Sequence, residues 1–343
     1  MRFSSQVLGT VVGLLVLNGC SAPDPGGPAA AGGADAGASG SAASAGTGAG
    51  SAGAPGSGGM GGSHRGGAGG LGGGEFAGGG GAGAAGGGPA GNGGTGGGAP
   101  SHRFSIRFDY RFDTVGFFTP ERRAALEAAG AIWSSVLRDD FDTVPKGTGI
   151  RLRNPENRDE YLWVNSIEED IDDLLVFVGT SEAIPGLGRS GPAGTVMTDD
   201  PVLDAALAAR RDGADFEPWA GSISFKASSN FFFDPTPASA GDIPPEAFDF
   251  ISTAGHELGH VLGFASCAAF TALISGTSFI GPAAQASYGG PVPLMSDLGH
   301  FQDHLQSDGV DTLMDPGISN GVRLVPTQLD RAVFADLGYE LSN

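Results

Sequence analysis

The sequence predicts an α+β domain of about 240 residues that follows a long Gly-rich segment. Composition divides the chain, because 36 of the 63 glycines fall between residues 21 and 101, whereas residues 102–343 have the make-up of a globular domain. Within the domain, an alternating apolar segment is followed by apolar residues at helical spacing. Further short strands and helices then predict a mixed sheet with helices packed on it.

The first strand is expected at residues 104–113, where aromatic and aliphatic residues alternate with polar ones. A helix should follow it. Residues 119–121, Thr-Pro-Glu, combine an N-cap residue, a proline at the first helical position and an acidic first turn. Apolar residues then recur at helical spacing through residues 125–136, which favours a helix that packs one face on the sheet.

Three further short strands are expected at residues 150–153, 174–179 and 222–226, each bounded by Gly, Pro or Asp. A helix is expected near the C-terminus, because Thr327 is an N-cap residue and Gly338 is a typical helix stop. The single cysteine of the domain, Cys267, stands beside an apolar segment and is expected to be a small buried residue.

The N-terminus has the pattern of a secretion signal: a basic residue near the start and an apolar run at residues 7–17 that is too short to span a bilayer. Residues 17–20, Leu-Asn-Gly-Cys, resemble the lipobox of bacterial lipoproteins. In those proteins the signal is cut before a cysteine, which here is Cys20, and the cysteine then carries lipid.

This resemblance implies a lipoprotein signal peptide at residues 1–19 and membrane anchoring through lipid on Cys20. Residues 20–101 contain too few large apolar residues to bury a core, so they are expected to form a disordered Gly/Ala/Ser-rich linker. Because Ser21 rather than Asp follows the cysteine, the resemblance also implies the outer membrane or the cell surface. Without lipidation, we expect the exported protein to be secreted.

The formal net charge is −20, and the domain carries −19 of it. A domain this acidic repels phosphate backbones, which argues against nucleic acid and anionic membrane surfaces as partners. Calcium is a further candidate cofactor, because carboxylates are hard oxygen ligands. Two acidic groups are candidates for it: Asp170, Asp172 and Asp173, and Asp199 and Asp200.

The chemistry is concentrated in residues 256–260, His-Glu-Leu-Gly-His, which match the His-Glu-x-x-His pattern. On a helix, residues four apart lie on one face about 6 Å apart along the axis, so the imidazoles of His256 and His260 can reach one zinc ion. Glu257 would then face a water at the open coordination position and serve as general base. Residues 244–246, Pro-Pro-Glu, are expected to start this helix.

The residue inventory restricts the third ligand. Three residues past Gly263 stands Ser266, a poor zinc ligand, and the only glutamate after the motif is Glu340, too near the C-terminus. The inventory therefore leaves His300 and His304.

At this point the sequence resembles a known family. The pattern His-Glu-x-x-His-x-x-Gly-Phe at 256–264, an insertion, His-Phe at 300–301 and Leu-Met-Asp-Pro at 313–316 resemble the leishmanolysin-like arrangement of the metzincin clan of zinc proteases. The resemblance covers about residues 104–341. It implies a zincin-like mixed sheet with an active-site helix in a catalytic domain at residues 102–343.

Carried over by position, the resemblance implies Zn²⁺ held by His256, His260 and His300, with His304 as the alternative third ligand. Glu257 would be the general base, and Met314 would occupy the methionine turn below the metal.

The same resemblance implies an edge strand that pairs with an extended substrate, and we assign residues 221–226 to it. The tyrosine that often follows the methionine turn in this clan is absent, since Asp315 stands there, and no second oxyanion stabiliser is identified.

We therefore expect a zinc-dependent endopeptidase that acts on protein or peptide substrates and is tethered at the bacterial cell surface. The alternative is a surface-tethered adhesin or binding module with a structural or vestigial zinc site. Substrate specificity and oligomeric state have no signal in the sequence.

Overall fold

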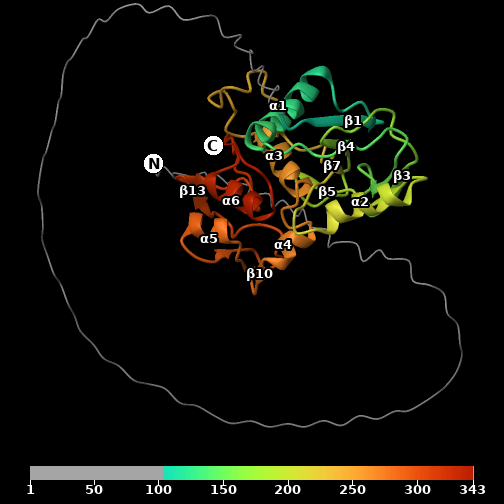
Figure 1. The fold of residues 1–343 in the computed structure, drawn as a ribbon. Coiled ribbons are helices and arrows are strands. Elements are labelled where there is room, and N and C mark those ends of the chain that lie inside the picture. Colours follow the sequence, from blue (N-terminus) through green and yellow to red (C-terminus); the bar gives the residue numbers. More distant parts are fainter. Residues whose placement is uncertain (1–102, 343) are drawn as a thin grey trace, which may run out of the picture. The chain divides into compact units, whose positions relative to one another are not determined.

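A four-stranded sheet with the strand order β1-β4-β7-β5 lies at the centre of the described region (Figure 1). The computed structural model describes residues 103–342, which belong to one compact unit. The expected signal peptide at 1–19, the expected lipidation site Cys20 and the expected linker at 20–101 lie outside the described residues. The described region combines helices with several sheets, which confirms the α+β class.

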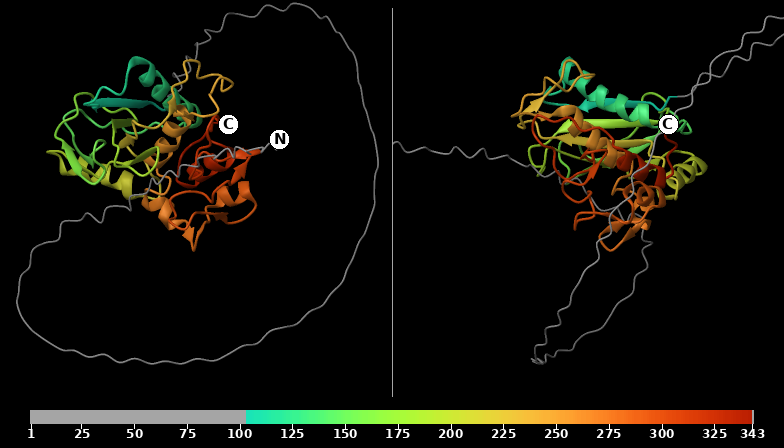
Figure 2. Two further views of the ribbon diagram at one scale, coloured as in Figure 1. Left: turned by 180° about the vertical axis from the view of Figure 1, so that it is seen from behind. Right: turned by 90° about the vertical axis from the view of Figure 1, so that its left-hand side faces the viewer.

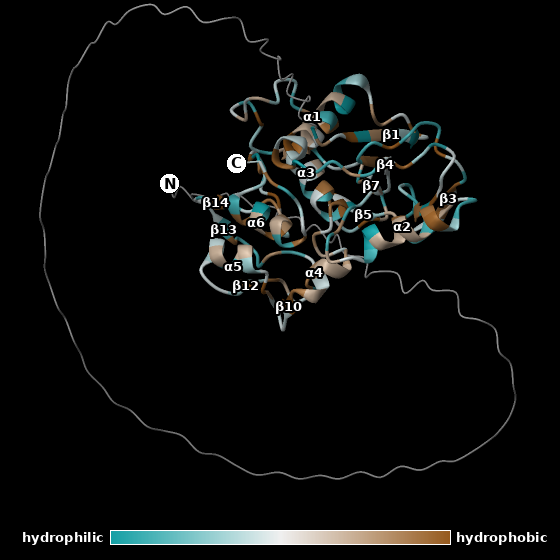
Figure 3. Cartoon of the chain, in the orientation of Figure 1, coloured by the Kyte–Doolittle hydropathy of each residue, from teal (hydrophilic) through white to brown (hydrophobic). Residues whose placement is uncertain are grey.

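Three strands of the central sheet are parallel: β1 (Ile106–Phe112), β4 (Leu174–Thr180) and β7 (Ala220–Phe225). The fourth strand, β5 (Gly188–Pro192), pairs antiparallel with β7 at one edge. The two inner strands, β4 and β7, are buried along nearly their whole length, and β4 is coloured as hydrophobic in Figure 3. Burial on both faces explains why their sequences are apolar or small throughout rather than alternating.

Two helices, α1 (Pro120–Val136) and α3 (Phe250–Val261), pack on one face of the central sheet. The indole N–H of Trp133 on α1 donates a hydrogen bond to the carbonyl oxygen of Gly255 on α3 at 2.8 Å. A buried tryptophan needs a partner for its N–H, so this bond fixes the position of α1 relative to α3.

A second, smaller core covers the other face. It lies between the central sheet and a three-stranded sheet of order β3-β2-β6, formed by β2 (Gly149–Arg153), β3 (Tyr161–Val164) and β6 (Thr195–Met197). The helix α2 (Pro201–Asp212) contributes its one buried residue, Leu207, to the same core. The central sheet is therefore the middle layer of three.

The remaining elements are short, except for the last helix, and most follow α3 in the chain. They are β8 (Phe231–Phe232), β9 (Phe248–Asp249), α4 (Ala268–Ala272), β10 (Ile274–Ser275), β11 (Ser278–Phe279), α5 (Pro282–Tyr288), β12 (Val292–Pro293), β13 (Gln306–Ser307), β14 (Val310–Asp311) and α6 (Gln328–Asp336). Figures 1 and 2 show those that follow α3, in orange and red, on the side of α3 away from most of the central strands.

The helix start expected at residues 244–246 is wrong, because α3 begins at Phe250. Its N-cap is Asp249, whose carboxylate accepts hydrogen bonds from the backbone N–H of Ser252 at 2.9 Å and from the Ser252 hydroxyl at 2.6 Å. The same carboxylate pairs with Arg323. This buried ion pair lies 74 residues apart in sequence, so the local pattern could not reveal the cap.

The assignment of residues 221–226 as the edge strand is also wrong. The strand exists as β7, but it lies inside the sheet between β4 and β5. The edge is β5, whose sequence Gly-Arg-Ser-Gly-Pro has neither apolar alternation nor β-branched residues and so carries no strand signal.

The C-terminal helix α6 is confirmed from the expected cap onward. The side chain of Thr327 accepts from the backbone N–H of Asp330, and Asp330 accepts from the backbone N–H of Thr327, which forms a capping box. None of the helices in residues 103–342 has the length and apolar character that crossing a bilayer requires.

Candidate metal centre

The helix α3 contains His256 and His260 and lies in the interior of the domain. All 12 of its residues are buried, and small residues allow its neighbours to approach closely. A Cβ atom at Gly259 would lie 2.5 Å from Met314 Sδ, so only glycine is compatible with that contact. The helix ends at Val261, and two residues later Gly263 adopts a φ of 115°, a left-handed conformation that favours glycine.

Both histidines of α3 present a proton-free Nε2. The Nδ1 of His256 lies 2.8 Å from the carbonyl oxygen of Leu313, and the Nδ1 of His260 lies 3.0 Å from that of Phe264. Because a carbonyl oxygen only accepts, each Nδ1 must carry the proton. Burial lowers the pKa of His256 to about 3 and that of His260 to about 4, so both rings are neutral at neutral pH.

The two Nε2 atoms face one another at 3.1 Å. Neither has a proton to donate to the other, so their lone pairs meet without a hydrogen bond. Two nitrogens bound to one tetrahedral zinc ion at 2.0–2.1 Å lie about 3.3 Å apart, close to the separation of this pair. The arrangement therefore fits a cation bound between His256 and His260.

The structure brings His300 to this pair. Its ring centroid lies 5.2 Å from that of His256 and 5.1 Å from that of His260, and the ligand atoms of the three imidazoles all lie within 4.8 Å of one another. His300 is 1% exposed, and neither of its ring nitrogens has a hydrogen-bond partner. A buried imidazole without any partner is costly, and a metal ion would satisfy it.

The other candidate, His304, lies elsewhere. Its side chain is 59% exposed, and it neighbours Asp303 and Asp315 rather than the paired histidines. The residue adopts a φ of 59°, and its backbone N–H donates to Asp315 at 2.5 Å. This left-handed backbone conformation is not helical, so the spacing of four residues from His300 does not correspond to a shared helical face.

Glu257 lies against the edge strand β5. The Ser190 hydroxyl is 2.6 Å from Glu257 Oε2, whereas Oε1 is buried and has no hydrogen-bond partner. A Cβ atom at Gly188 would lie 2.5 Å from Oε1, so the glycine leaves room for the carboxylate. Strand β5 thus holds one carboxylate oxygen and leaves the other available.

Burial also sets the protonation of Glu257. Loss of solvent raises the pKa of this carboxyl to about 7, while the bond from Ser190 and the charges of Arg158 and Arg189 act to lower it. A carboxyl group with a pKa near 7 can both accept and release a proton at neutral pH.

Met314 packs against α3, and its assignment to the methionine turn below the metal stays a prediction. It is fully buried with its sulfur against Gly259. Its backbone carbonyl oxygen accepts the N–H of Phe301 at 3.1 Å, next to His300. The turn that contains Met314 therefore supports both the helix and the loop of the third histidine.

Asp330 was not identified from the sequence. Its buried carboxylate accepts hydrogen bonds from the backbone N–H groups of Leu313 at 2.9 Å and Met314 at 3.0 Å. The Thr-x-x-Asp spacing from Thr327 could have indicated its capping role, but not its contact with the turn. Ser190 and Gly188 were missed as well, because nothing in the sequence marks β5 as a strand.

In each of the two acidic groups proposed for calcium, at least one carboxylate has other contacts in the described residues. Asp173 accepts from the backbone N–H groups of Ser105 at 2.6 Å and Phe141 at 3.1 Å. Asp200 caps α2 through the backbone N–H of Val202 at 2.8 Å. These carboxylates fix loops and a helix end, and calcium binding stays a prediction.

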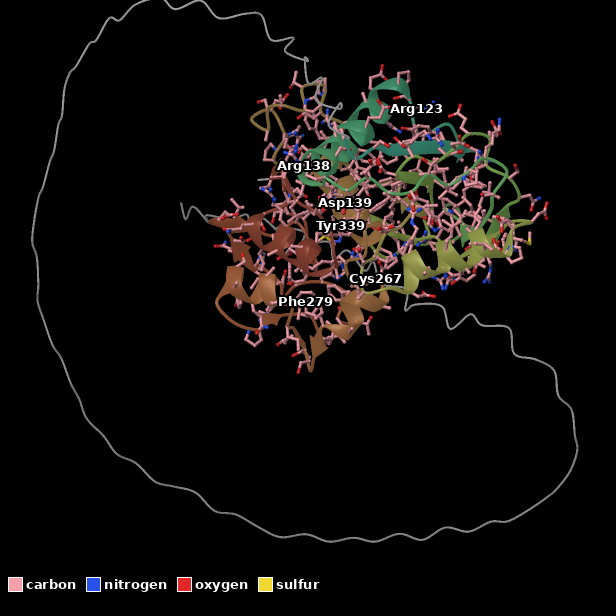
Figure 4. All side chains as sticks on the ribbon, viewed as in Figure 1. Arg123, Arg138, Asp139, Cys267, Phe279 and Tyr339 are labelled. Carbon is pink, nitrogen blue, oxygen red and sulfur yellow. The ribbon has the colours of Figure 1, made fainter. Side chains whose placement is uncertain are left out.

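Cys267 is buried, as expected, and Figure 4 shows it within the described region. Its sulfur accepts the backbone N–H of Phe270 at 3.4 Å, and burial raises the pKa of the thiol to about 11. A thiol that stays protonated is a poor nucleophile and a poor metal ligand.

Comparison with models of protein families and with curated proteins finds no match for this chain.

Proposed function

We propose that this chain is a zinc-dependent endopeptidase with a zincin-like fold of the metzincin clan. The observation that carries the proposal is the convergence of three buried imidazoles, two of them with proton-free Nε2 atoms 3.1 Å apart, beside the carboxylate of Glu257. His256, His260 and His300 would hold the zinc ion. When bound, zinc supplies a Lewis acid that acidifies a water molecule and polarises a peptide carbonyl.

The chain's own residues supply the proton transfer. Glu257 Oε1 has no hydrogen-bond partner, so it is the atom that accepts a proton from the attacking water and delivers it to the leaving amine. The hydroxyl of Ser190 orients the carboxylate through Oε2. The edge strand β5 offers its outer side to an extended peptide, which would pair with it as an added strand.

We also propose a cellular location for this protein, which is based only on its sequence. Export through the signal at residues 1–19, a lipid anchor on Cys20 and a linker at residues 20–101 would hold the domain at the outer membrane or the cell surface. Intact-mass measurement of the protein purified from membranes tests this part. The mass of a diacylglyceryl or triacyl modification on a chain that begins at Cys20 is the expected result.

The catalytic proposal is tested with Glu257→Gln, which keeps the size of the side chain but removes the base. We expect kcat on an unfolded protein substrate to fall at least about a hundredfold, while one zinc ion per chain is retained. The matched control is Glu246→Gln, because Glu246 is exposed on the described surface.

Two results would contradict the proposal. One is peptidase activity of Glu257→Gln equal to that of the parent protein. The other is a zinc-loaded parent protein that cleaves no peptide, which favours the alternative of an adhesin or binding module with a structural zinc site.

A further inference from the structure

A cluster of arginines lies on the face of the central sheet opposite Glu257. Along β5, Gly188 and Ser190 face α3, so Arg189 and Gly191 face the other way. On that face Arg158 lies over the β5–β7 pair, where its Nη2 is 3.9 Å from the Cβ position of Gly191.

The guanidinium of Arg158 is buried without an ionic partner. The residue is 5% exposed, Nη1 donates to the hydroxyl of Ser222 at 2.6 Å, and Nε has no hydrogen-bond partner. Burial lowers its pKa to about 9, with the charges of Arg189 and Arg153 acting in the same direction and the charge of Glu257 acting to raise it. Arg158 is therefore repelled by two neighbouring guanidinium groups, and the one carboxylate whose charge acts on it is that of Glu257 across the sheet.

Arg153 lies next to Arg158, since its Nη1 donates to the carbonyl oxygen of Arg158 at 3.4 Å. The guanidinium of Arg153 stacks 3.8 Å from the ring centroid of Tyr161, and its Nε is buried without a partner. Within residues 103–342, neither Arg153 nor Arg158 forms an ion pair with a carboxylate. Arg153 is partly exposed, so the cluster can be reached from solvent.

The same fold shows how a buried arginine is otherwise neutralised. Arg323 lies 2.7 Å from a carboxylate oxygen of Asp234 and 2.8 Å from one of Asp249, and both acids are inaccessible to solvent. The domain carries a net charge of −19, so carboxylates are abundant in it. Buried cations without such a partner are costly, and an external anion would supply what the chain does not.

The position of the arginine cluster indicates which anion would bind there. β5 is an edge strand, and side chains of a peptide that extends the sheet there would alternate between the two faces. Those on one face point toward Glu257, and those on the other point toward the arginines. A carboxylate suits this site, because planar guanidinium groups bind carboxylates through paired, charge-assisted hydrogen bonds.

We propose that Arg153 and Arg158 form a subsite for a carboxylate of an extended peptide bound along β5. This inference rests on the proposed function and adds a substrate class to it, namely peptides with an acidic residue near the cleaved bond. The subsite lies across the sheet from the catalytic carboxylate.

The test uses the full zinc-loaded chain and matched peptides that differ by one Glu or Gln, scanned through each position around a cleavage site. Besides the Glu and Gln peptides, a third set of peptides has a free C-terminus as its only carboxylate. Its controls are the same peptides with an amidated C-terminus. We expect kcat/KM of the parent protein to favour Glu over Gln at one position by about tenfold or more. In Arg153→Gln the preference should fall to about twofold or less.

Arg107→Gln is the matched control, because Arg107 is an exposed arginine on the opposite edge strand β1, paired with Glu169. Its preference for Glu should equal that of the parent protein. Arg158→Gln is expected to act like Arg153→Gln. If burial prevents that variant from folding, Arg153→Gln alone decides.

Binding to Glu257→Gln separates this inference from the catalytic proposal, since affinity for the peptides is measured without cleavage. Equal affinity for Glu and Gln peptides at every position, with no gain from a free C-terminus, overturns the subsite. A preference only for peptides with a free C-terminus would show that the subsite binds the C-terminal carboxylate of the peptide and not an acidic side chain. Tighter binding of Glu peptides with no cleavage by the parent protein supports the subsite and rejects the peptidase.

Discussion

The carboxylate of Asp330 is connected to the imidazole of His256 through a single residue. Asp330 Oδ2 accepts the backbone N–H of Leu313 at 2.9 Å, and the carbonyl oxygen of Leu313 accepts Nδ1–H of His256 at 2.8 Å. A metal-binding histidine whose second nitrogen is fixed in this way has its tautomer and ring orientation set in advance.

Asp330→Asn is therefore expected to weaken zinc binding. The amide keeps one acceptor and introduces an N–H₂ group among N–H donors of the turn, so one backbone N–H loses its partner. We expect zinc affinity, measured by competition with a chromogenic chelator, to fall about tenfold to a hundredfold.

The control for Asp330→Asn is Asp336→Asn on the same helix. Asp336 also accepts two backbone N–H groups, those of Ala283 and Ala284, both at 2.8 Å, but they belong to α5. Asp336→Asn should lower thermal stability and leave zinc affinity unchanged. Equal zinc affinity of both variants and the parent protein would show that Asp330 has only a structural role.

Ser190→Ala should impair the proposed catalysis without removing the metal. The hydroxyl is the only group that donates to Glu257 Oε2 among the hydrogen bonds of the described residues. Its loss frees the carboxylate to rotate and removes an interaction that favours the charged form, so we expect kcat to fall about tenfold with KM nearly constant. Ser190→Thr, which retains a hydroxyl, should recover part of the rate.

Ser224→Ala is the comparison for Ser190→Ala. Ser224 is also buried in the central sheet, but its hydroxyl has no hydrogen-bond partner. Its removal should leave kcat within about twofold of the parent value. A similar loss of rate in both variants would mean that the sheet, rather than the contact with Glu257, is responsible.

The two histidines that the sequence left open should behave differently. His300→Ala removes a buried imidazole from the metal centre, and we expect the purified variant to hold less than about a tenth of the parent's zinc after dialysis. His304→Ala changes an exposed side chain and should retain one zinc per chain. Metal analysis by mass spectrometry measures both, and zinc loss in the second variant alone would contradict this ligand set.

The pH dependence of stability should contain a contribution from Asp139. Burial raises the pKa of this carboxyl to about 6, and the nearby Glu340 and Asp215 add to the effect. The side chain lies beside Tyr339 in Figure 4. A raised pKa means that the folded state holds the proton more tightly than the unfolded chain. Its favourable contribution is present below about pH 4 and is lost as pH rises through 6.

Asp139→Asn should therefore stabilise the protein at pH 7.5 by about 1 kcal/mol, less than the full shift implies because the carboxylate is partly exposed. At pH 4 the gain should vanish. Chemical denaturation at the two pH values measures it, with Asp199→Asn as an exposed control of equal charge change. An equal increase in the free energy of unfolding for both variants would show that the change in net charge, and not the burial of Asp139, causes the effect.

The sequence by itself determined the parts of the site that lie close together in the chain. His256, Glu257 and His260 share one helix, so their spacing predicts, without knowledge of the fold, that the two imidazoles lie on one face with the carboxylate on the same turn. The same holds for the strands β1, β4 and β7 and for the cap of α6, because apolar periodicity and capping are local signals.

The tertiary structure decided what depends on distant contacts. It brought His300 rather than His304 to the helix, since a turn at His304 with a φ of 59° separates two residues that the spacing could not distinguish. It also made β5 the edge strand and put Ser190 on Glu257, 67 residues away in sequence. Pairing between strands and packing of buried polar groups are non-local, so no pattern within one segment contains them.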